Sequence, residues 1–228
     1  MSPIRDRQSA AYRKARDELL EAERELMEQR ERVAELRRGL PGGTLLDRDY
    51  TFLEGPLDLN RNSETDYFET NLTDLLADGR NELILQHMMF APDAERGCPM
   101  CSMWADGLDA VAHHLSDKVN LVLVARTKLE NLRAWGQQRG WRRLRLLSSA
   151  DNDFNPDLGV EISPDRQLPA FSVFTRDANG DVYHRYTTEG SLEERHHRAM
   201  DLYSPVWNVF DLLPGGRGDW FPKHFYDR

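Results

Sequence analysis

Three segments of strand length, separated by helical segments, constrain the fold of this chain more than any other feature. Two are apolar runs, residues 82–90 (ELILQHMMF) and 119–125 (VNLVLVA), and the third predicted strand is 143–149. Residues 106–115 lie in a predicted helix after the first run, and 128–139 form a predicted helix after the second. Continuous apolar strands that alternate with helices are typical of parallel strands covered on both faces. The sequence therefore predicts an α/β fold.

A hairpin follows these units. Residues 170–175 and 182–187 read as strands joined by Asp177-Ala178-Asn179-Gly180, and Asn-Gly is a strong hairpin signal. The resulting order, β-α-β-α-β followed by β-β-α, predicts a thioredoxin-like mixed sheet flanked by helices. The last helix is expected over 192–213, with a break at Pro205.

The N-terminal part reads as one long charged helix over residues 5–38. Its apolar or weakly apolar positions follow a heptad spacing: Tyr12, Ala15, Leu19, Ala22, Leu26, Val33 and Leu36. Glycine and proline at 39–43 end the helix. We therefore divide the chain into a charged helix, 1–40, and a thioredoxin-like domain with a C-terminal helical extension, 41–228. The apolar seam either packs along that domain or pairs with its copy in a homodimer. Between the helix and the first apolar run, short elements are expected at 49–53 and 72–77.

Charge and hydropathy exclude two classes of partner. The formal net charge is −9, and an acidic chain repels the phosphate backbone of nucleic acid. An arginine cluster at 139–145 reads as a solvated face. No apolar run approaches the roughly 20 residues that span a bilayer. The first seven residues also lack the apolar stretch of a signal peptide, so a cytoplasmic location is expected.

The two cysteines of the chain form the motif Cys98-Pro99-Met100-Cys101. A pair this close is a poor structural crosslink, because it closes almost no loop. The motif follows a predicted strand and opens a predicted helix, where free N–H groups stabilise a thiolate. Pro99 suits the first helical position, and Arg96 adds a nearby positive charge. We expect Cys98 to be the exposed nucleophile and Cys101, one turn further, to resolve a mixed disulfide.

Two other interpretations of the cysteine pair stay open. A structural zinc site needs two further ligands at recognisable spacing, and the chain has seven histidines but no second cysteine pair. The cysteines are also compatible with an inert pair that shares a helix start. Redox chemistry is the favoured interpretation, and no metal is expected.

Pro169 is the second feature expected in a thioredoxin-like site. Leu168-Pro169 immediately precedes the predicted strand 170–175, which is where that fold carries a cis-proline facing the dithiol. We therefore predict a cis bond before Pro169 and assign this residue to the catalytic set, although a trans proline that ends a loop is the simpler alternative.

Three stretches of the sequence resemble a known family. They are QHMMFAPDAERGCPMCSMWADGLD, SSADNDFNPDLGV and PVWNVFDLLPGGRGDWFP, and together they resemble the bacterial DUF899 family over most of the chain. The resemblance implies a thioredoxin-like fold and a dithiol–disulfide oxidoreductase activity. It places the paired cysteines of that family at Cys98 and Cys101, and its Asp-Phe-Asn segment at Asp153-Phe154-Asn155.

The remaining candidates surround the dithiol in the predicted site. Pro99 and Met100 occupy the two positions that tune a redox potential, and Trp104 is either core or part of a ligand platform. Asp153 and Asn155 lie in a polar loop. That loop either lies beside the dithiol, with a carboxylate as proton acceptor for Cys101, or forms a turn with side-chain caps.

These residues predict a thiol–disulfide oxidoreductase. Its substrate is expected to be a thiol or disulfide, of a protein or a small molecule, and an external thiol would return it to its starting state. No Gly-x-Gly-x-x-Gly fingerprint indicates a nicotinamide or flavin, so no cofactor is expected. One alternative is a thiol peroxidase, although such proteins typically carry Pro-x-x-x-Thr-x-x-Cys and no threonine stands at that position here. The other alternative is a non-catalytic binding module with an ordinary thiol.

Overall fold

A computed structural model describes residue 3 and residues 7–76, 79–188, 201 and 203–226. The chain divides into two compact units, Met1–Gly42 and Gly43–Arg228.

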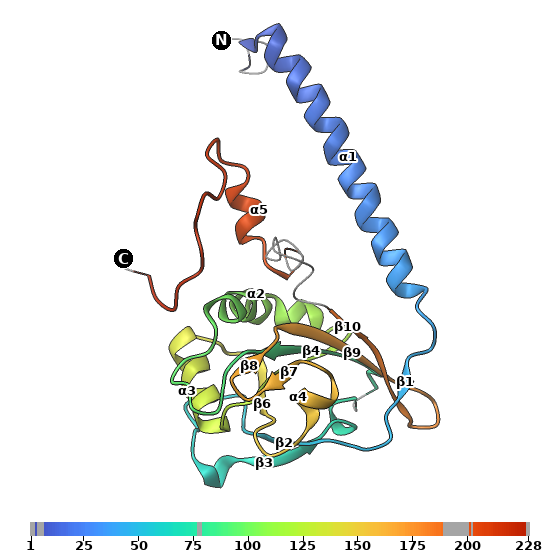
Figure 1. Ribbon diagram of the computed structural model, residues 1–228, viewed down its shortest axis with the longest axis vertical. Helices are drawn as coiled ribbons and strands as arrows, with labels where there is room; N and C mark the ends of the chain where they lie inside the picture. The colour runs from blue at the N-terminus through green and yellow to red at the C-terminus, as the bar shows by residue number, and fades with distance from the viewer. Residues whose placement is uncertain (1–2, 4–6, 77–78, 189–200, 202, 227–228) are drawn as a thin grey trace. The chain divides into compact units, whose positions relative to one another are not determined.

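The first unit consists of the helix α1, Ala10–Arg38 (Figure 1). It begins five residues later than the sequence pattern predicts, because Ser9 caps it and its Oγ accepts a hydrogen bond from the Tyr12 N–H at 3.1 Å. Arg37 and Arg38 lie in the last turn, where positive charge is favourable, and the helix ends at Gly39. None of its described residues is buried. In the predicted apolar seam, Tyr12, Leu19, Leu26 and Leu36 are exposed and Val33 is half-buried.

The second unit is built on an eight-stranded mixed sheet in the order β1-β10-β9-β4-β5-β6-β2-β3. Its strands are β1 (Thr44–Leu45), β2 (Thr51–Glu54), β3 (Phe68–Asn71), β4 (Glu82–Met88), β5 (Asn120–Ala125), β6 (Arg145–Ser148), β9 (Ala170–Arg176) and β10 (Val182–Thr187). The β4–β5 and β5–β6 pairs are parallel, and the other pairs are antiparallel. A separate two-stranded hairpin joins β7 (Glu161–Ser163) to β8 (Arg166–Gln167).

The strand order confirms the predicted fold class. The three predicted strands form β4, β5 and β6, and the predicted hairpin forms β9 and β10. The helix α2, Pro99–Leu115, connects β4 to the parallel strand β5, and β9 pairs antiparallel on the other side of β4. The strand order β10-β9-β4-β5, with α2 connecting β4 to β5, is the thioredoxin-like arrangement.

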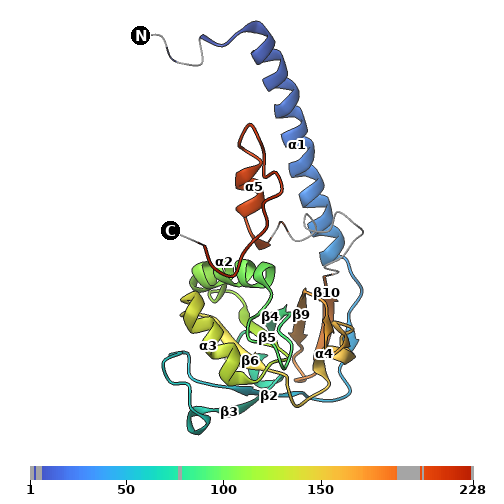
Figure 2. The ribbon, with the colours of Figure 1, turned by 60° about the vertical axis from the view of Figure 1, so that its left-hand side comes forward.

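The sheet has a different set of elements on each face (Figure 2). One face packs against α2 and α3 (Leu129–Arg139) in a core that contains Cys101, Trp104 and Trp135. Side chains alternate along a strand, so the neighbouring residues point to the other face. There a second core forms around Phe154 of the short helix α4, Phe154–Asp157.

His87 of β4 lies on the second face, stacked on Phe154 at 5.7 Å between ring centroids. Its Nε2 is 2.8 Å from the Ser172 hydroxyl oxygen. Burial lowers the pKa of His87 to about 3. His87 is therefore a neutral core residue.

The smaller elements complete the second unit. They are the 3-10 turns Glu64–Asp66 and Asp74–Leu76 and the helix α5, Val206–Phe210. The predicted helix over 192–213 falls partly outside the described residues, and α5 begins immediately after Pro205. In the described part of the chain, no helix is long and apolar enough to cross a membrane.

Candidate functional site

The dithiol lies where β4 passes through a loop into α2. Cys98 is the residue before the first turn of α2, and Pro99 is the first helical residue, as the sequence predicts. The Cys98 N–H donates a hydrogen bond to the Met89 carbonyl oxygen at 2.9 Å, which ties the start of the helix to the end of the strand. Both cysteines are free thiols; Cys98 is partly buried and Cys101 fully buried.

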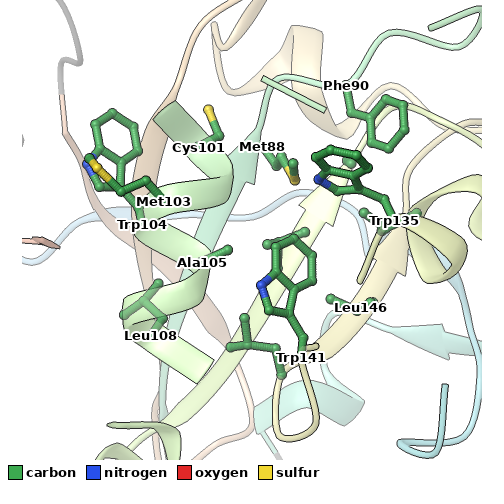
Figure 3. Packing of buried hydrophobic residues seen from close by; sticks show 14 of the residues in the cluster. Met88, Phe90, Cys101, Met103, Trp104, Ala105, Leu108, Trp135, Trp141 and Leu146 are labelled. Atoms are coloured by element: carbon green, nitrogen blue, oxygen red, sulfur yellow. The ribbon is translucent and has the colours of Figure 1, made fainter. Parts of the chain in front are cut away.

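Gly97, directly before Cys98, is closely packed against neighbouring side chains. A Cβ built on Gly97 would lie 2.1 Å from the Met88 Cε and 3.2 Å from the Trp135 Nε1. Figure 3 shows Met88, Phe90 and Trp135 gathered beside the first turns of α2, with Cys101 near the start of that helix. A side chain at position 97 would therefore require the Met88 methyl group to move and the Trp135 and Phe90 rings to shift by a few tenths of an ångström.

Hydrogen bonds fix the first turns of α2 from two sides. The Ser102 hydroxyl donates to the Cys98 carbonyl oxygen at 2.9 Å and accepts from the Trp135 indole N–H at 3.0 Å. The Gln86 side-chain amide donates to the Cys101 carbonyl oxygen at 3.0 Å. These buried groups hold the backbone that carries both sulfurs. The sequence does not predict Gln86, Ser102 and Trp135 as site residues, because no motif marks them.

The two thiols have unequal acidity. A hydrogen bond from the Cys101 thiol lowers the pKa of Cys98 to about 7, with help from the backbone N–H groups of Cys101 and Met100 and against the effect of burial. The same hydrogen bond, together with burial and the charge of the Cys98 thiolate, raises the pKa of Cys101 well above its usual range. The pair thus holds one thiolate, on the less buried sulfur.

The predicted cis bond before Pro169 is wrong. Among the described residues no peptide bond is cis. The Leu168 N–H donates to the Val160 carbonyl oxygen at 2.8 Å, so the chain runs from the β7–β8 hairpin directly into β9, and the trans form is intrinsically preferred. Ala170 pairs with His87, which places Pro169 beside the end of β4 and therefore at the same end of the sheet as the dithiol.

The other predicted residues of α2 and its loop lie around the dithiol. Met100 and Trp104 are buried in the core beneath α2, and the Trp104 ring lies 6.5 Å from Phe171 between centroids. Trp104 is therefore part of the core. The Arg96 guanidinium lies 5.5 Å above the Phe225 ring.

Asp153 and Asn155 are not brought to the dithiol. Phe154 between them belongs to the core on the opposite face of the sheet. Asn155 is buried and accepts a hydrogen bond from the Ser149 hydroxyl at 2.7 Å, while Asp153 is exposed. The Phe154 N–H donates to the Asn152 side-chain oxygen at 3.0 Å. This contact is of the kind expected if the polar loop is a turn with side-chain caps.

The C-terminal segment contributes residues that the sequence did not point to. His224 Nε2 lies 3.0 Å from the Gly97 carbonyl oxygen, and the His224 ring contacts Trp135 edge-on at 5.6 Å. No periodicity or motif in residues 214–226 indicates this contact, which joins positions 127 residues apart. Within the described residues, no three His, Cys, Asp or Glu side chains are grouped to hold a metal ion.

Several solved structures with a similar arrangement are named as peroxiredoxins. The 2-Cys peroxiredoxin of Plasmodium vivax is 18% identical with a TM-score of 0.47, over 72% of this chain and 95% of that one. The 1-Cys peroxiredoxin of Plasmodium falciparum is 11% identical with a TM-score of 0.49, over 65% and 85%. Peroxidoxin BcpB of Mycobacterium tuberculosis is 16% identical with a TM-score of 0.46, over 71% and 94%.

Sequence comparison identifies the family. No curated protein matches the chain. A family model described as "Bacterial protein of unknown function (DUF899)" matches residues 2–227, nearly the whole sequence and including both cysteines. The chain belongs to the DUF899 family.

Proposed function

We propose that this protein is a thiol–disulfide oxidoreductase in which Cys98 attacks and Cys101 resolves. The observation that carries the proposal is the unequal pair at the start of α2: the pKa of Cys98 is lowered to about 7 and the pKa of Cys101 is raised. A thiol that titrates near neutral pH combines a large thiolate fraction with good nucleophilicity. The buried, protonated partner is protected from side reactions until a mixed disulfide forms beside it.

The reaction transfers two electrons to the substrate. The Cys98 thiolate attacks one sulfur of a substrate disulfide, the substrate S–S bond breaks, and the leaving sulfur takes a proton from solvent. Cys101 then loses its proton and attacks the Cys98 sulfur. A Cys98–Cys101 disulfide forms, and the second substrate thiol leaves. Loss of the negative charge on Cys98 in the mixed disulfide removes one cause of the raised pKa of Cys101, which favours this second step.

An external thiol completes the cycle. It reduces the Cys98–Cys101 disulfide by the same exchange in reverse, so the protein needs a thiol reductant and a disulfide substrate as its two partners. We place the reaction in the cytoplasm, where thiol reductants keep such pairs reduced.

The exposed seam of α1 is the second part of the proposal. Tyr12, Leu19 and Leu26 are each 52% exposed. Heptad positions of this kind suit a second copy of the same helix, so we propose a homodimer through α1.

A comparison of two substrates tests the proposed activity. We expect the wild-type protein, supplied with reduced glutathione, to reduce hydroxyethyl disulfide at least about tenfold faster than hydrogen peroxide. The reason is the loop before Cys98, in which residues 91–97 contain no threonine of the kind that peroxidatic thiol sites carry. A preference for peroxide would assign the protein to the thiol peroxidases. Turnover of neither substrate would favour the binding module.

A further inference from the structure

The C-terminal segment Trp220–Tyr226 reaches the peptide group that carries Cys98. His224 Nε2 lies 3.0 Å from the Gly97 carbonyl oxygen. Because a carbonyl oxygen only accepts hydrogen bonds, Nε2 carries the proton and donates. The Gly97 carbonyl belongs to the same peptide group as the Cys98 N–H, which donates to the Met89 carbonyl oxygen at 2.9 Å. Both polar atoms of this one planar group are therefore held, one by β4 and one by His224.

The orientation of this peptide group sets how its dipole faces the Cys98 sulfur. Cys98 has φ −52° and ψ 132°, and φ is the rotation that relates its side chain to the preceding peptide plane. The backbone N–H groups of Met100 and Cys101, which lower the pKa of Cys98, follow it in the chain and keep their place if that plane turns. A turn of the plane instead changes where the negative Gly97 carbonyl oxygen lies relative to the thiolate, and a donor on that oxygen both holds it and offsets its charge. Gly97 has no side chain to restrict such a turn, so the two hydrogen bonds of this peptide group fix its orientation.

His224 is itself held independently of its ring. Its carbonyl oxygen accepts a hydrogen bond from Arg139 Nη1 at 2.6 Å, and the Arg139 guanidinium is in turn paired with Asp106. The next residue, Phe225, contacts Trp135 edge-on at 5.8 Å between ring centroids. The segment is therefore anchored to α2 and α3 through its backbone and through Phe225. These anchors do not use the imidazole Nε2, which donates to the Gly97 carbonyl oxygen.

We propose that His224 is a positioning residue of the dithiol site, which holds the Gly97–Cys98 peptide in the orientation that the attacking sulfur requires. The proposal rests on the proposed function, because it assigns His224 to the thiol that attacks. The titratable or charged groups that face this site are Cys101 from α2, beside Cys98, and His224 from the C-terminal segment, on the Gly97 carbonyl. Arg139, paired with Asp106, donates to the His224 carbonyl oxygen, and Arg96 of the loop before Cys98 lies over the Phe225 ring.

The rate of alkylation of Cys98 by iodoacetamide, measured against pH, tests the proposal. In the wild-type protein the rate is expected to rise with a midpoint near pH 7. His224→Phe keeps an aromatic ring against Trp135 and removes the donor, so the midpoint is expected to rise by about one pH unit. At pH 7 that shift lowers the thiolate fraction, and with it the alkylation rate, by about fivefold.

Two further variants separate the hydrogen bond from other effects of the substitution. The amide of His224→Gln can donate to the Gly97 carbonyl without carrying a charge, and we expect its midpoint within about 0.3 pH unit of wild type. His224→Asn carries the same amide on a shorter side chain that does not reach, so it gives the upward shift if the phenylalanine variant does not fold. Lys223→Ala removes an exposed side chain of the same segment and leaves the midpoint unchanged.

The outcomes distinguish this proposal from the proposed function. A wild-type midpoint near pH 8.5 to 9 would overturn the proposed function itself, because Cys98 would then be an ordinary thiol. A wild-type midpoint near pH 7 that both His224→Phe and His224→Asn preserve would leave Cys98 as the nucleophile and overturn the role of His224. A glutamine variant that shifts as far as the phenylalanine variant would also overturn it, because the contribution would then be the charge of the imidazole.

Discussion

Cys98→Ser abolishes disulfide reduction, whereas Cys101→Ser leaves a protein that attacks a disulfide once and stops. In the first variant the nucleophile is lost, and turnover is expected to fall at least about a thousandfold, since a serine hydroxyl without a general base does not attack disulfides. In the second variant Cys98 still attacks, but no thiol is present to resolve the product. One equivalent of the mixed disulfide is then expected to accumulate, and mass spectrometry of the intact protein after reaction with hydroxyethyl disulfide measures it.

The side chain that replaces Cys101 also decides how reactive Cys98 remains. The Cys101 thiol donates the hydrogen bond that does most to lower the pKa of Cys98. A serine hydroxyl at position 101 still donates, so Cys98 should stay reactive near neutral pH. Cys101→Ala removes the donor and should slow alkylation of Cys98. Wild-type turnover by Cys101→Ser, without an accumulated adduct, would contradict the resolving role of Cys101.

The largest loss of stability is expected at Asp109 in α2. The Asp109 Oδ1 accepts backbone N–H hydrogen bonds from Arg142, Arg143 and Leu144 at 2.9, 2.7 and 3.0 Å. Its side chain is buried, and these donors form the turn that leads into β6. Asp109→Ala leaves three backbone donors without this acceptor and is expected to lower the free energy of unfolding by about 3 kcal/mol.

Urea denaturation with an unchanged m-value measures this loss. Asp109→Asn keeps an oxygen acceptor but loses the charge, so it is expected to cost about half as much. Asp117→Ala, an exposed position after the same helix, should stay within about 0.5 kcal/mol of wild type. If Asp109→Ala were as mild as Asp117→Ala, Asp109 would not hold this turn.

The sequence predicts the central strands and the start of α2 because both leave local signals. Residues 82–90 and 119–125 are mostly apolar, residues 143–149 have the length of a strand, and Pro99 can occupy a first helical position without losing a hydrogen bond. The outer part of the sheet has no such signal. β2 pairs antiparallel with β6, Leu53 opposite Ser148, and a contact between segments so distant in sequence is not encoded in either segment alone.

In the candidate site, too, some residues can be predicted from the sequence and others cannot. The placement of Cys98 and Cys101 follows from the strand-to-helix junction, whereas the contact between His224 and Gly97 depends on where a non-periodic C-terminal segment packs. The trans bond before Pro169 could not be predicted, because the two isomers of an X–Pro bond differ by only about 0.5–1 kcal/mol and the surroundings decide. The position of Asp153 depended on which face of the sheet its loop covers, and neighbouring polar residues do not indicate a face.

A glutathione redox titration of the purified protein tests directly whether the Cys98–Cys101 pair is a redox centre. The Cys98–Cys101 pair is read by mass after alkylation at each ratio of reduced to oxidised glutathione. We expect a reversible two-electron transition between about −120 and −290 mV, whose position separates a reductant from an oxidant of protein disulfides. A pair that stays reduced throughout, or that forms only mixed adducts with glutathione, would contradict the assignment of this dithiol as a redox centre.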